Sequence, residues 1–355
     1  MNILFVITKS EVGGAQKFVK EQIDISTKNF NVFLCTNKHG WLENATKLQL
    51  NGMLLHEGIE KMTSIGFLIK LYRFIKANKI NLVVTNSANG GFYGRLAAFF
   101  AGTPSCYFSH GWSSVYNGGK FAFVLNFIEK ILSIISKKII CVSDNDYNVA
   151  INKIGIMPLK LCVLKNAIYP VINNSNSRKA IEKKSFTVIA LARFASPKRI
   201  DLMIAAFKQL PNLNLHIAGT GPDFMYWQQY LLHNNISNIT LLGEVPSFNN
   251  FNNYEAFLLI SDSEGLPISA IEAMSAGLPL ILSNVGGCPE LILNNGILVD
   301  NNCNAIVNAV LEVQQKQHDM RVQSKLLFDK YYNLNMVSQT YINTYVSLIN
   351  KYSSN

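Results

Sequence analysis

The sequence has few charged residues, no long apolar run and no clustered cysteines. Only 15% of its 355 residues are charged and 49% are hydrophobic, a balance that argues against a disordered chain. No stretch reaches the roughly 18 to 20 uninterrupted apolar residues that span a bilayer. The first apolar run, residues 3–7, is too short for a signal peptide and follows no basic segment, so we expect a cytoplasmic protein. The six cysteines show no CxxC spacing, and we expect them to be reduced core residues.

Acidic residues are scarce in the first half of the chain, which carries the whole net charge of +10. Residues 1–168 hold 19 Lys and Arg against 9 Asp and Glu, whereas residues 169–355 hold 13 of each class. A basic half of this kind favours an anionic partner, either nucleic acid or a phospholipid surface. The alternative is that the lysines are scattered and only keep the chain soluble.

The GxGxxG motif is missing, which argues against a dinucleotide-binding dehydrogenase, but strands and helices alternate clearly. Short apolar runs such as NILFVIT and NLVVTN alternate with helical patterns, and the alternation restarts after the polar stretch YPVINNSNSRKAIEKK. This order indicates parallel sheets with helices on both faces. The sequence predicts an α/β protein with two doubly wound domains, 1–168 and 187–335, joined by a linker, 169–186. We expect residues 336–355 to form a helix that packs back on the first domain.

Two carboxylates lie eight residues apart in SDSEGLPISAIEAMSAGLPLILSNVGG, which begins at Ser261. A buried strand ends there, Pro267 suits the first position of a helix, and Glu272 falls about one and a half turns inside that helix. Free N–H groups at a helix start favour an anion such as a phosphate. Carboxylates accept hydrogen bonds from hydroxyls, so Glu264 and Glu272 beside an anion site predict a ligand with phosphate and sugar hydroxyls. The alternative makes Glu264 a helix-start charge and Glu272 a surface residue.

Cations and glycines elsewhere fit the same kind of ligand. In ALARFASPKRIDLMIAAF, Arg193 ends a strand and Lys198 follows five residues later, so the two could hold a diphosphate. Either cation alone is more often a solvated surface charge. Gly13 and Gly14 in TKSEVGGAQ would let a ligand approach the backbone, although a bare glycine pair also suits an ordinary turn. His110 ends a strand in YFSHGWSS, where a hydrogen-bonded loop histidine is the alternative.

Together these motifs resemble the retaining nucleotide-sugar glycosyltransferases of family four. The resemblance rests on SDSEGLPISAIE, RFASPK, HIAGTGP, LGEV and SNVGGCPELI, and it covers essentially the whole chain. It implies the GT-B fold, in which two Rossmann-like doubly wound domains face each other across a cleft. TKSEVGGAQ, SHGWSSVYNGG and ISDSEGLP further resemble bacterial O-antigen and capsule glycosyltransferases that add N-acetylhexosamine, notably N-acetylgalactosamine, to a lipid-linked acceptor.

The resemblance implies roles for the motif residues of the second domain. Glu264 would hold hydroxyls of the donor sugar, and Glu272 would hold the ribose hydroxyls. Arg193 and Lys198 would hold the diphosphate and neutralise the departing nucleotide. Val245 in LGEV would lie near the base.

Backbone groups and first-domain loops complete the implied site. The backbone of Gly265 and Leu266 would meet the sugar and the phosphate, and Gly13 with Gly14 would border the diphosphate and the acceptor. His110 would approach the reacting sugar, either by donating to a hydroxyl or by stabilising positive charge through its neighbouring carbonyl. The expected catalytic residues are Glu264, His110, Arg193 and Lys198.

An Asp-x-Asp sequence, Asp144 to Asp146, holds a divalent cation in another class of glycosyltransferase. Here it follows CVS at the close of the first domain and opens a helix, so we interpret Asp144 as the helix N-cap. GT-B enzymes neutralise the diphosphate with cationic side chains and helix ends instead. We therefore expect no metal and no cofactor, with a UDP-sugar as the donor substrate.

Two segments of the basic half are candidates for membrane contact. SIGFLIKLYRFIKANK alternates apolar and basic positions at helical spacing and offers Lys70, Arg73, Lys76 and Lys79. GKFAFVLNFIEKILSIISKK is more apolar and ends in Lys137 and Lys138. Each could instead be a helix that simply packs on the sheet. Their place in the basic half favours peripheral docking on the anionic inner face of the cell membrane.

The sequence thus predicts a retaining glycosyltransferase that moves an N-acetylhexosamine, with N-acetylgalactosamine as the best candidate, from a UDP-sugar. The predicted acceptor is a polyprenyl-diphosphate-linked saccharide in O-antigen or capsular polysaccharide synthesis. A UDP-sugar 2-epimerase of the same architecture is the alternative enzyme. A noncatalytic nucleic-acid-binding protein is the alternative from another class, and the neutral second half, which carries the best ligand motifs, disfavours it.

Overall fold

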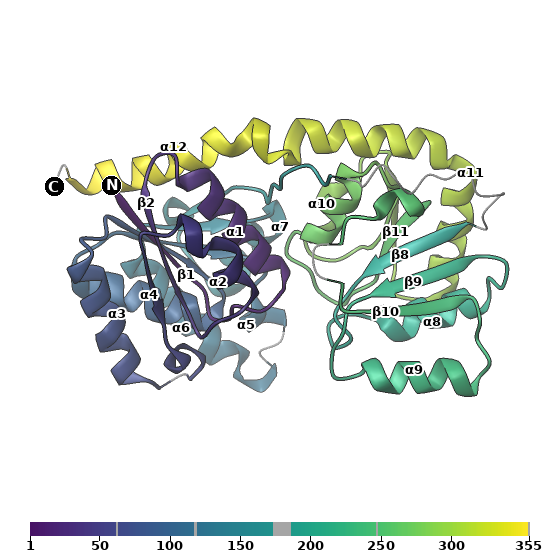
Figure 1. Cartoon of the computed structure of the whole chain (residues 1–355), viewed down its shortest axis with the longest axis horizontal. Coiled ribbons are helices and arrows are strands. Elements are labelled where there is room, and N and C mark those ends of the chain that lie inside the picture. The colour runs from purple at the N-terminus through teal and green to yellow at the C-terminus, as the bar shows by residue number, and fades with distance from the viewer. Residues whose placement is uncertain (62, 117–118, 173–185, 246–247, 354–355) are drawn as a thin grey trace. The chain divides into compact units, whose positions relative to one another are not determined.

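The computed structural model describes residues 1–61, 63–116, 119–172, 186–245 and 248–353. The chain divides into two compact units (Figure 1): Met1–Asn166 with Asn335–Asn355, and Ala167–Leu334. The sequence analysis placed the first boundary after residue 168 and began the C-terminal segment at residue 336. Residues 173–185, most of the predicted linker, and residues 117–118 of the motif SHGWSSVYNGG lie outside the described residues.

The first unit is built on a parallel seven-stranded sheet with the order β3-β2-β1-β4-β5-β6-β7. Apolar runs without alternation suit strands that are covered on both faces, and all five residues of Leu82–Asn86 are buried. Ile3 pairs with both Val32 and Leu82, which places the first strand in the middle of the sheet. The strands are β1 (Asn2–Val6), β2 (Asn31–Thr36), β3 (Gly52–Leu55), β4 (Leu82–Asn86), β5 (Ser105–Ser109), β6 (Lys138–Cys141) and β7 (Leu161–Val163).

Helices of the first unit pack closely on this sheet, because small residues line the contact. A Cβ on Gly94 would lie 2.4 Å from Cγ2 of Thr85, so α4 approaches β4 more closely than an alanine would allow. The helices are α1 (Gly14–Ser26), α2 (Trp41–Thr46), α3 (Ile65–Ala77), α4 (Ala88–Ala101), α5 (Ser113–Tyr116), α6 (Ala122–Ile135), α7 (Asp144–Val149) and α12 (Leu334–Ser353).

The C-terminal helix α12 completes the first unit. Tyr345 is fully buried, its ring meets the rings of Phe5 and Phe108, and its hydroxyl lies 2.8 Å from Oε1 of Gln22 on α1. Tyr341 is also fully buried and donates to the carbonyl of Lys165 at 2.5 Å. Two tyrosines one turn apart therefore join the end of the chain to strands and a helix made from its beginning.

The second unit has a parallel six-stranded sheet with the order β10-β9-β8-β11-β12-β13. Its core strand Ala256–Leu259 is buried at every position. The strands are β8 (Thr187–Leu191), β9 (Asn214–Ala218), β10 (Ile239–Gly243), β11 (Ala256–Leu259), β12 (Leu280–Ser283) and β13 (Gly296–Val299). The main helices are α8 (Ile200–Lys208), α9 (Phe224–His233), α10 (Ile268–Ser275) and α11 (Cys303–Leu327).

Both sheets confirm the predicted doubly wound architecture. The strand order reverses between β1 and β4 in the first unit and between β8 and β11 in the second. In sheets of this kind, ligands bind outside the carboxyl ends of the strands at such a reversal. The loops after β1, β4, β8 and β11 are therefore the places to look for a site. Within the described residues, no helix has the length and apolar character needed to cross a membrane.

Candidate active site

Glu264 lies on the tight loop that joins β11 to α10. Ser261 is still buried after the strand, and the chain then turns before α10 begins at Ile268. The side chain of Glu264 is only 11% exposed. Pro267 is the N-cap of α10, so its prediction as the first helical residue was wrong: its ψ of 116° is extended, as N-cap residues usually are.

The glycines of SNVGG are explained by their contact with this loop. Gly286 has a φ of +55°, and a Cβ at that position would lie 1.8 Å from the carbonyl oxygen of Glu264. The N–H of Gly287 donates to the carbonyl of Gly265 at 2.8 Å. The loop after β12 therefore packs directly on the backbone of the residues that carry the predicted donor contacts.

Lys198 and Glu264 meet at the point where the strand order reverses. The Lys198 ammonium donates to Oε1 of Glu264, and the Lys198 side chain is 18% exposed. Lys198 also forms an isolated antiparallel bridge with Ser261, which holds the two loops together through their backbones. The structure thus brings together two residues that the sequence analysis assigned to different parts of the donor, the diphosphate and the sugar.

Arg193 lies at the end of the β8 segment with its side chain exposed. Within the described part of the chain it forms no ion pair, so its guanidinium is open to an anion. The HIAGTGP turn supports this segment: a Cβ on Gly219 would lie 2.0 Å from the carbonyl of Ala192, and one on Gly221 would lie 2.4 Å from that of Phe194. Gly219 has a φ of +140°, which other residues rarely adopt.

The remaining predicted donor residues differ in exposure. Glu272 lies on α10 and is 8% exposed, so the alternative that made it a surface residue is wrong. Gly265 is buried and Leu266 is 3% exposed. Val245 follows β10 and is 39% exposed, which leaves an apolar surface free for contact.

Hydrogen bonds from Arg199 and Asn301, which sequence reasoning missed, hold the residues next to Glu264 in its loop. Arg199 donates to Asp201 at 2.7 Å and to Asp262 at 3.2 Å, and the hydrogen bond from Arg199 holds the pKa of Asp201 below its usual range. The Nδ2 atom of Asn301 donates to the carbonyl of Ser261 at 3.0 Å. Arg199 directly follows Lys198 in the sequence, and this pair of adjacent cations is the sequence feature that could have pointed to the contacts of Arg199.

The first unit places Gly13 and Gly14 after β1, one of the two strands at its reversal. Gly13 is the N-cap of α1, after the loop from β1, and Gly14 begins that helix. A Cβ on Gly14 would meet nothing within 4 Å among the described atoms, so the chain's own packing does not require glycine there. Gly13 has an extended φ of −179°, so its conformation does not require glycine either.

His110 follows β5 and is held by Asn86 at the end of β4. Its Nε2 lies 3.0 Å from Oδ1 of Asn86, and its ring meets the ring of Phe18 edge to face at 4.8 Å between centroids. Burial lowers the pKa of His110 to about 4, so the imidazole is neutral near pH 7. Asn86 is fully buried, and sequence reasoning missed it although it closes the apolar run NLVVTN.

The Asp-x-Asp sequence has a different local role from the one predicted. Ser143 is the N-cap of α7, and its hydroxyl accepts from the N–H of Asp146 at 3.0 Å. Asp144 is the first residue of the helix, where its carboxylate pairs with Lys165 at 3.2 Å, so its interpretation as the N-cap was wrong. Over the described ranges, no three His, Cys, Asp or Glu side chains gather as metal ligands would.

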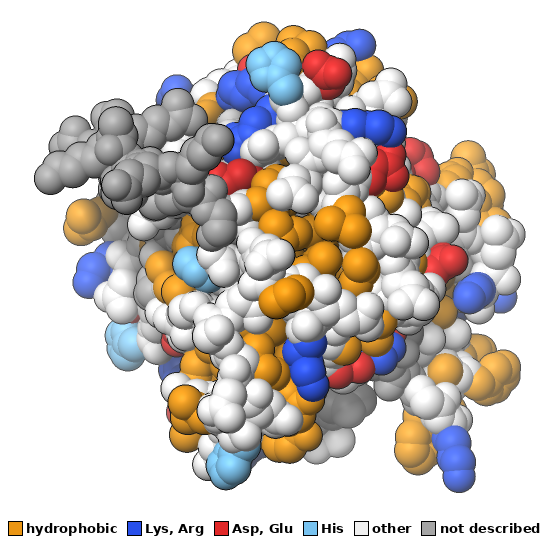
Figure 2. Space-filling view, turned by 90° about the vertical axis from the view of Figure 1, so that its right-hand side faces the viewer, with side chains coloured by type: hydrophobic (Ala, Val, Ile, Leu, Met, Phe, Trp, Pro, Cys, Tyr) orange, Lys and Arg blue, Asp and Glu red, His pale blue; other side chains and the backbone are white. Residues whose placement is uncertain are grey.

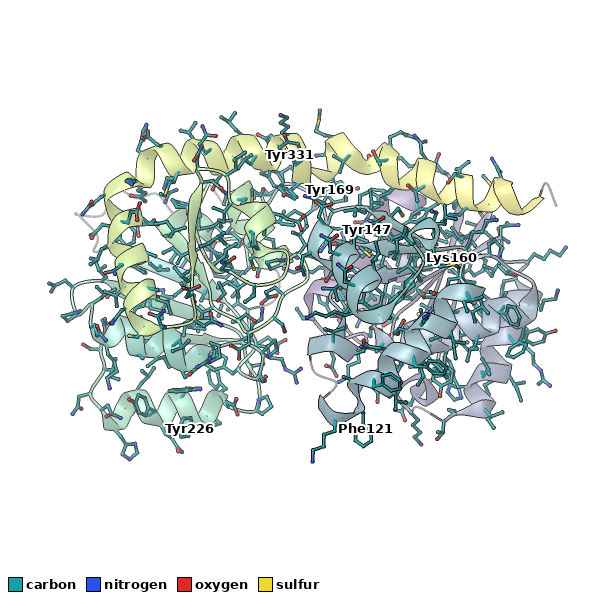
Figure 3. The ribbon with its side chains drawn as sticks, turned by 180° about the vertical axis from the view of Figure 1, so that it is seen from behind. Phe121, Tyr147, Lys160, Tyr169, Tyr226 and Tyr331 are labelled. Atoms are coloured by element: carbon teal, nitrogen blue, oxygen red, sulfur yellow. The ribbon has the colours of Figure 1, made fainter. Side chains whose placement is uncertain are left out.

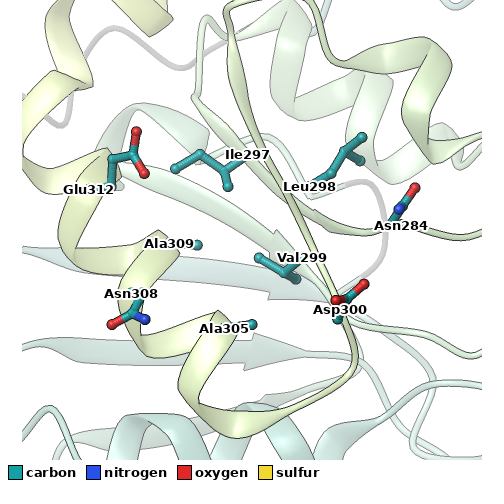
Figure 4. A pocket seen from close by; sticks show the side chains of 9 residues that line it. All are labelled: Asn284, Ile297, Leu298, Val299, Asp300, Ala305, Asn308, Ala309 and Glu312. Carbon is teal, nitrogen blue, oxygen red and sulfur yellow. The ribbon is translucent and has the colours of Figure 1, made fainter.

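A cavity of about 400 Å³ opens elsewhere in the second unit, between β13 and α11 (Figure 4). None of the predicted site residues lines it. The cavity is lined by Asn284, Ile297, Leu298, Val299, Asp300, Ala305, Asn308, Ala309 and Glu312.

On the face of the molecule seen in Figure 2, acidic and basic side chains are interspersed, in keeping with the zero net charge of the second half.

Two doubly wound units with polar side chains at their strand reversals are the architecture of the GT-B class of α/β proteins. Residues 12–170 match the family model described as Glycosyltransferase Family 4, and residues 171–325 match that described as Glycosyl transferases group 1. The chain is 36% identical over 348 residues to the O-antigen biosynthesis glycosyltransferase WbnH of Escherichia coli, covering 98% of this chain and 99% of that protein. The chain therefore belongs to the family-four glycosyltransferases with the GT-B fold, as its motifs predicted.

Another relative is similar in sequence, and a solved structure has a similar fold. The UDP-Gal:alpha-D-GlcNAc-diphosphoundecaprenol alpha-1,3-galactosyltransferase of E. coli is 28% identical over 285 residues, covering 73% of each chain. The crystal structure of Anabaena HepE in complex with UDP and glucose aligns with a TM-score of 0.84 at 18% identity, covering 97% of this chain and 99% of that one. At that identity the likeness concerns the fold.

Proposed function

We propose that this glycosyltransferase moves an N-acetylhexosamine, with N-acetylgalactosamine as the best candidate, from a UDP-sugar to a polyprenyl-diphosphate-linked saccharide. The observation that carries the proposal is the Lys198–Glu264 pair, where a cation and a carboxylate meet at the strand reversal of the second unit. The similarity to WbnH suggests O-antigen or capsular polysaccharide synthesis, and the UDP in the HepE complex suggests the donor nucleotide.

The donor residues divide between the two chemical parts of a UDP-sugar. Arg193, exposed and free of ion pairs among the described residues, is suited to the diphosphate. An ammonium has three donors, so Lys198 can keep Glu264 and also bind a phosphate oxygen. That arrangement leaves Glu264 acceptor positions for sugar hydroxyls.

The other donor contacts follow from burial and exposure. Glu272, buried on α10, is suited to the ribose hydroxyls, and exposed Val245 to the flat face of the base. Backbone groups of Gly265 and Leu266 would meet the sugar and the phosphate.

We propose that transfer proceeds with retention of the anomeric configuration. As the bond to UDP breaks, negative charge grows on the diphosphate, where Arg193 and Lys198 stabilise it, while positive charge grows on the sugar. The departing phosphate takes the proton of the acceptor hydroxyl, so no separate base is needed. His110 is neutral at pH 7 and acts through a hydrogen bond or its neighbouring carbonyl, and the backbone of Gly13 and Gly14 would border the diphosphate and the acceptor.

The function is tested with a panel of nucleotide sugars and polyprenyl-diphosphate saccharides. We expect one UDP-N-acetylhexosamine to be used, with NMR of the product showing the donor's own anomeric configuration. An inverted product would refute the retaining mechanism. Conversion of the sugar without any acceptor would indicate the 2-epimerase instead.

Glu264→Gln keeps the shape of the side chain and removes its charge. We expect kcat to fall by about 10²- to 10³-fold, because the hydroxyl contacts and the partner of Lys198 are both weakened. Glu312→Gln, which removes an exposed carboxylate on α11, is the matched control and should transfer sugar normally. Turnover in Glu264→Gln equal to that of the control would remove Glu264 from the proposed site.

A further inference from the structure

Helix α6 carries large apolar side chains on its outward side as well as on the side that packs against the first unit. It turns its carboxylate inward: Glu129 pairs at 2.9 Å with Arg95 of α4, whose side chain is fully buried. Leu132 and Ser133 are its buried residues. Figure 3 shows Phe121, just before α6, with its side chain turned away from the ribbon. The outward side chains, each 45% to 82% exposed, are Phe121, Phe123, Val124, Phe127, Ile131 and Ile134.

Neighbouring segments extend this apolar face. Phe99 and Phe100, 54% and 62% exposed, end α4, the helix that contacts α6 through the Arg95–Glu129 pair. Leu159, 87% exposed, lies beside the end of α6, because Lys160 next to it donates to the carbonyl of Ile134 at 2.9 Å. We call the exposed residues of α6 with these three the α6 face. Apolar surface of this extent is rare on a chain that meets only water.

Lysines outnumber acids in the segment that contains most of the α6 face. Residues 119–160 contain six lysines and three acids. Of these acids, Glu129 points inward, Asp146 is fully buried and Asp144 pairs with Lys165. The lysines are Lys120, Lys130, Lys137, Lys138, Lys153 and Lys160.

Three of these lysines form a cluster at the end of α6. Lys138 donates to the carbonyl of Leu159 at 2.8 Å, and Lys160 donates to that of Ser136 at 2.8 Å. Burial, and then the charges of Lys137 and Lys138, lower the pKa of Lys160. The cluster is therefore a local positive field beside the apolar stripe, which suits an anionic partner.

Helix α3, the other predicted docking segment, is built in the ordinary way. It buries Phe67, Leu71 and Ile75 in the core of the first unit, and Lys70 contacts His56. It exposes apolar residues too, but its stripe at helical spacing points inward. The two segments thus differ in how many large apolar side chains they leave exposed, and α6 exposes more of them.

We propose that the α6 face enters the headgroup and acyl boundary of an anionic phospholipid bilayer, with the Lys137, Lys138 and Lys160 cluster on the lipid phosphates. An apolar stripe bordered by lysines is the chemistry of a helix that lies in a membrane interface. The inference rests on the proposed function, because a polyprenyl-linked acceptor lies in a membrane, and it specifies where the chain would attach. It does not depend on which sugar is transferred.

The test is co-sedimentation of the full chain with vesicles of phosphatidylethanolamine and phosphatidylglycerol, compared with phosphatidylcholine alone. We expect the wild type to bind the anionic vesicles more tightly, and Phe123→Ser/Phe127→Ser to lower that affinity more than about tenfold. The matched control is Met225→Ser/Tyr226→Ser, which removes two exposed apolar side chains from α9 and should bind normally. Lys137→Gln/Lys138→Gln/Lys160→Gln should bind anionic vesicles less tightly and lose most of the salt dependence.

Two further measurements separate membrane docking of the α6 face from misfolding of the variant and from self-association of the chain. Transfer to a water-soluble acceptor analogue should be unchanged in Phe123→Ser/Phe127→Ser, which shows that the variant folds. If the wild type binds vesicles but transfers no sugar, the proposed reaction fails and the docking surface stands. Wild-type binding that survives the double substitution overturns the proposal. So does a variant that only loses self-association in size-exclusion chromatography, because the α6 face would then join two copies of the chain.

Discussion

His110 is held neutral by the surroundings of its imidazole. With a folded-state pKa of about 4 against an ordinary 6.5, the unfolded chain binds more protons between these pH values. The contribution to stability is therefore complete above pH 6.5 and is lost as the pH falls toward 4. We expect this loss to be at most about 3 kcal/mol.

Urea unfolding at several pH values checks this prediction. His110→Gln should remove that part of the pH dependence, whereas His233→Gln, a substitution at an exposed position of α9, should leave the curve unchanged. An imidazole of His110 that titrates near 6.5 by NMR would contradict the assignment.

The sequence identified single candidate residues of the site but not the contacts between them. Arg193, Lys198, Glu264 and His110 were picked out because each follows an apolar run, and parallel strands bring such ends to one edge of a sheet. The direct pairing of Lys198 with Glu264 was not predicted, because 66 residues separate them and no local pattern encodes that distance. Asn86 was missed for the same reason, because its role depends on its contact with His110, which is distant in the sequence.

At the scale of elements, we expect opposite effects on stability from substituting two glycines, Gly286 in the loop after β12 and Gly14 at the start of α1. Gly286→Ala would force a Cβ into the carbonyl of Glu264 at a positive φ, so we expect a loss of about 2 to 4 kcal/mol with displacement of the Glu264 loop. Gly14→Ala meets open space at the start of α1, so we expect a gain of about 0.5 to 1 kcal/mol.

Thermal unfolding and transfer kinetics separate the two cases. If substrate approaches the backbone at Gly14, then Gly14→Ala should raise KM despite its higher stability. A stable Gly14→Ala with unchanged kinetics would remove Gly14 from the site, and a normal melting temperature for Gly286→Ala would show that the loop is free to move.

The positions of helices and strands were predictable from the periodicity of apolar residues. The side of a helix that packs on the sheet was not. The runs NILFVIT and NLVVTN match β1 and β4 because strands buried on both faces read as continuous apolar segments. The sequence of α6 is apolar on most sides, so it does not say which side meets the sheet. Only the buried Arg95, 34 residues away, shows that Glu129 turns inward.

At the scale of the whole molecule, α12 ties the end of the chain to the first unit. Tyr345→Ala would remove a buried ring and its hydrogen bond to Gln22, so we expect a loss of about 3 to 5 kcal/mol. Met336→Ala, at a 72% exposed position of the same helix, should cost less than about 0.5 kcal/mol. Chemical denaturation of both variants gives the comparison, and equal stabilities would mean that α12 does not support the first unit.

The tyrosines of α12 also set an order of events during synthesis. Strand β1 and helix α1 are made early, yet Tyr345 and Tyr341, whose rings meet Phe5 on β1 and Phe18 on α1, are made after the whole second unit. While the second unit is being made, the nascent first unit therefore lacks the aromatic contacts that Tyr341 and Tyr345 give to Phe18 and Phe5. A chain that stops before α12 would leave the surface around Phe5 and Phe18 more open to chaperones and proteases than a chain that includes α12.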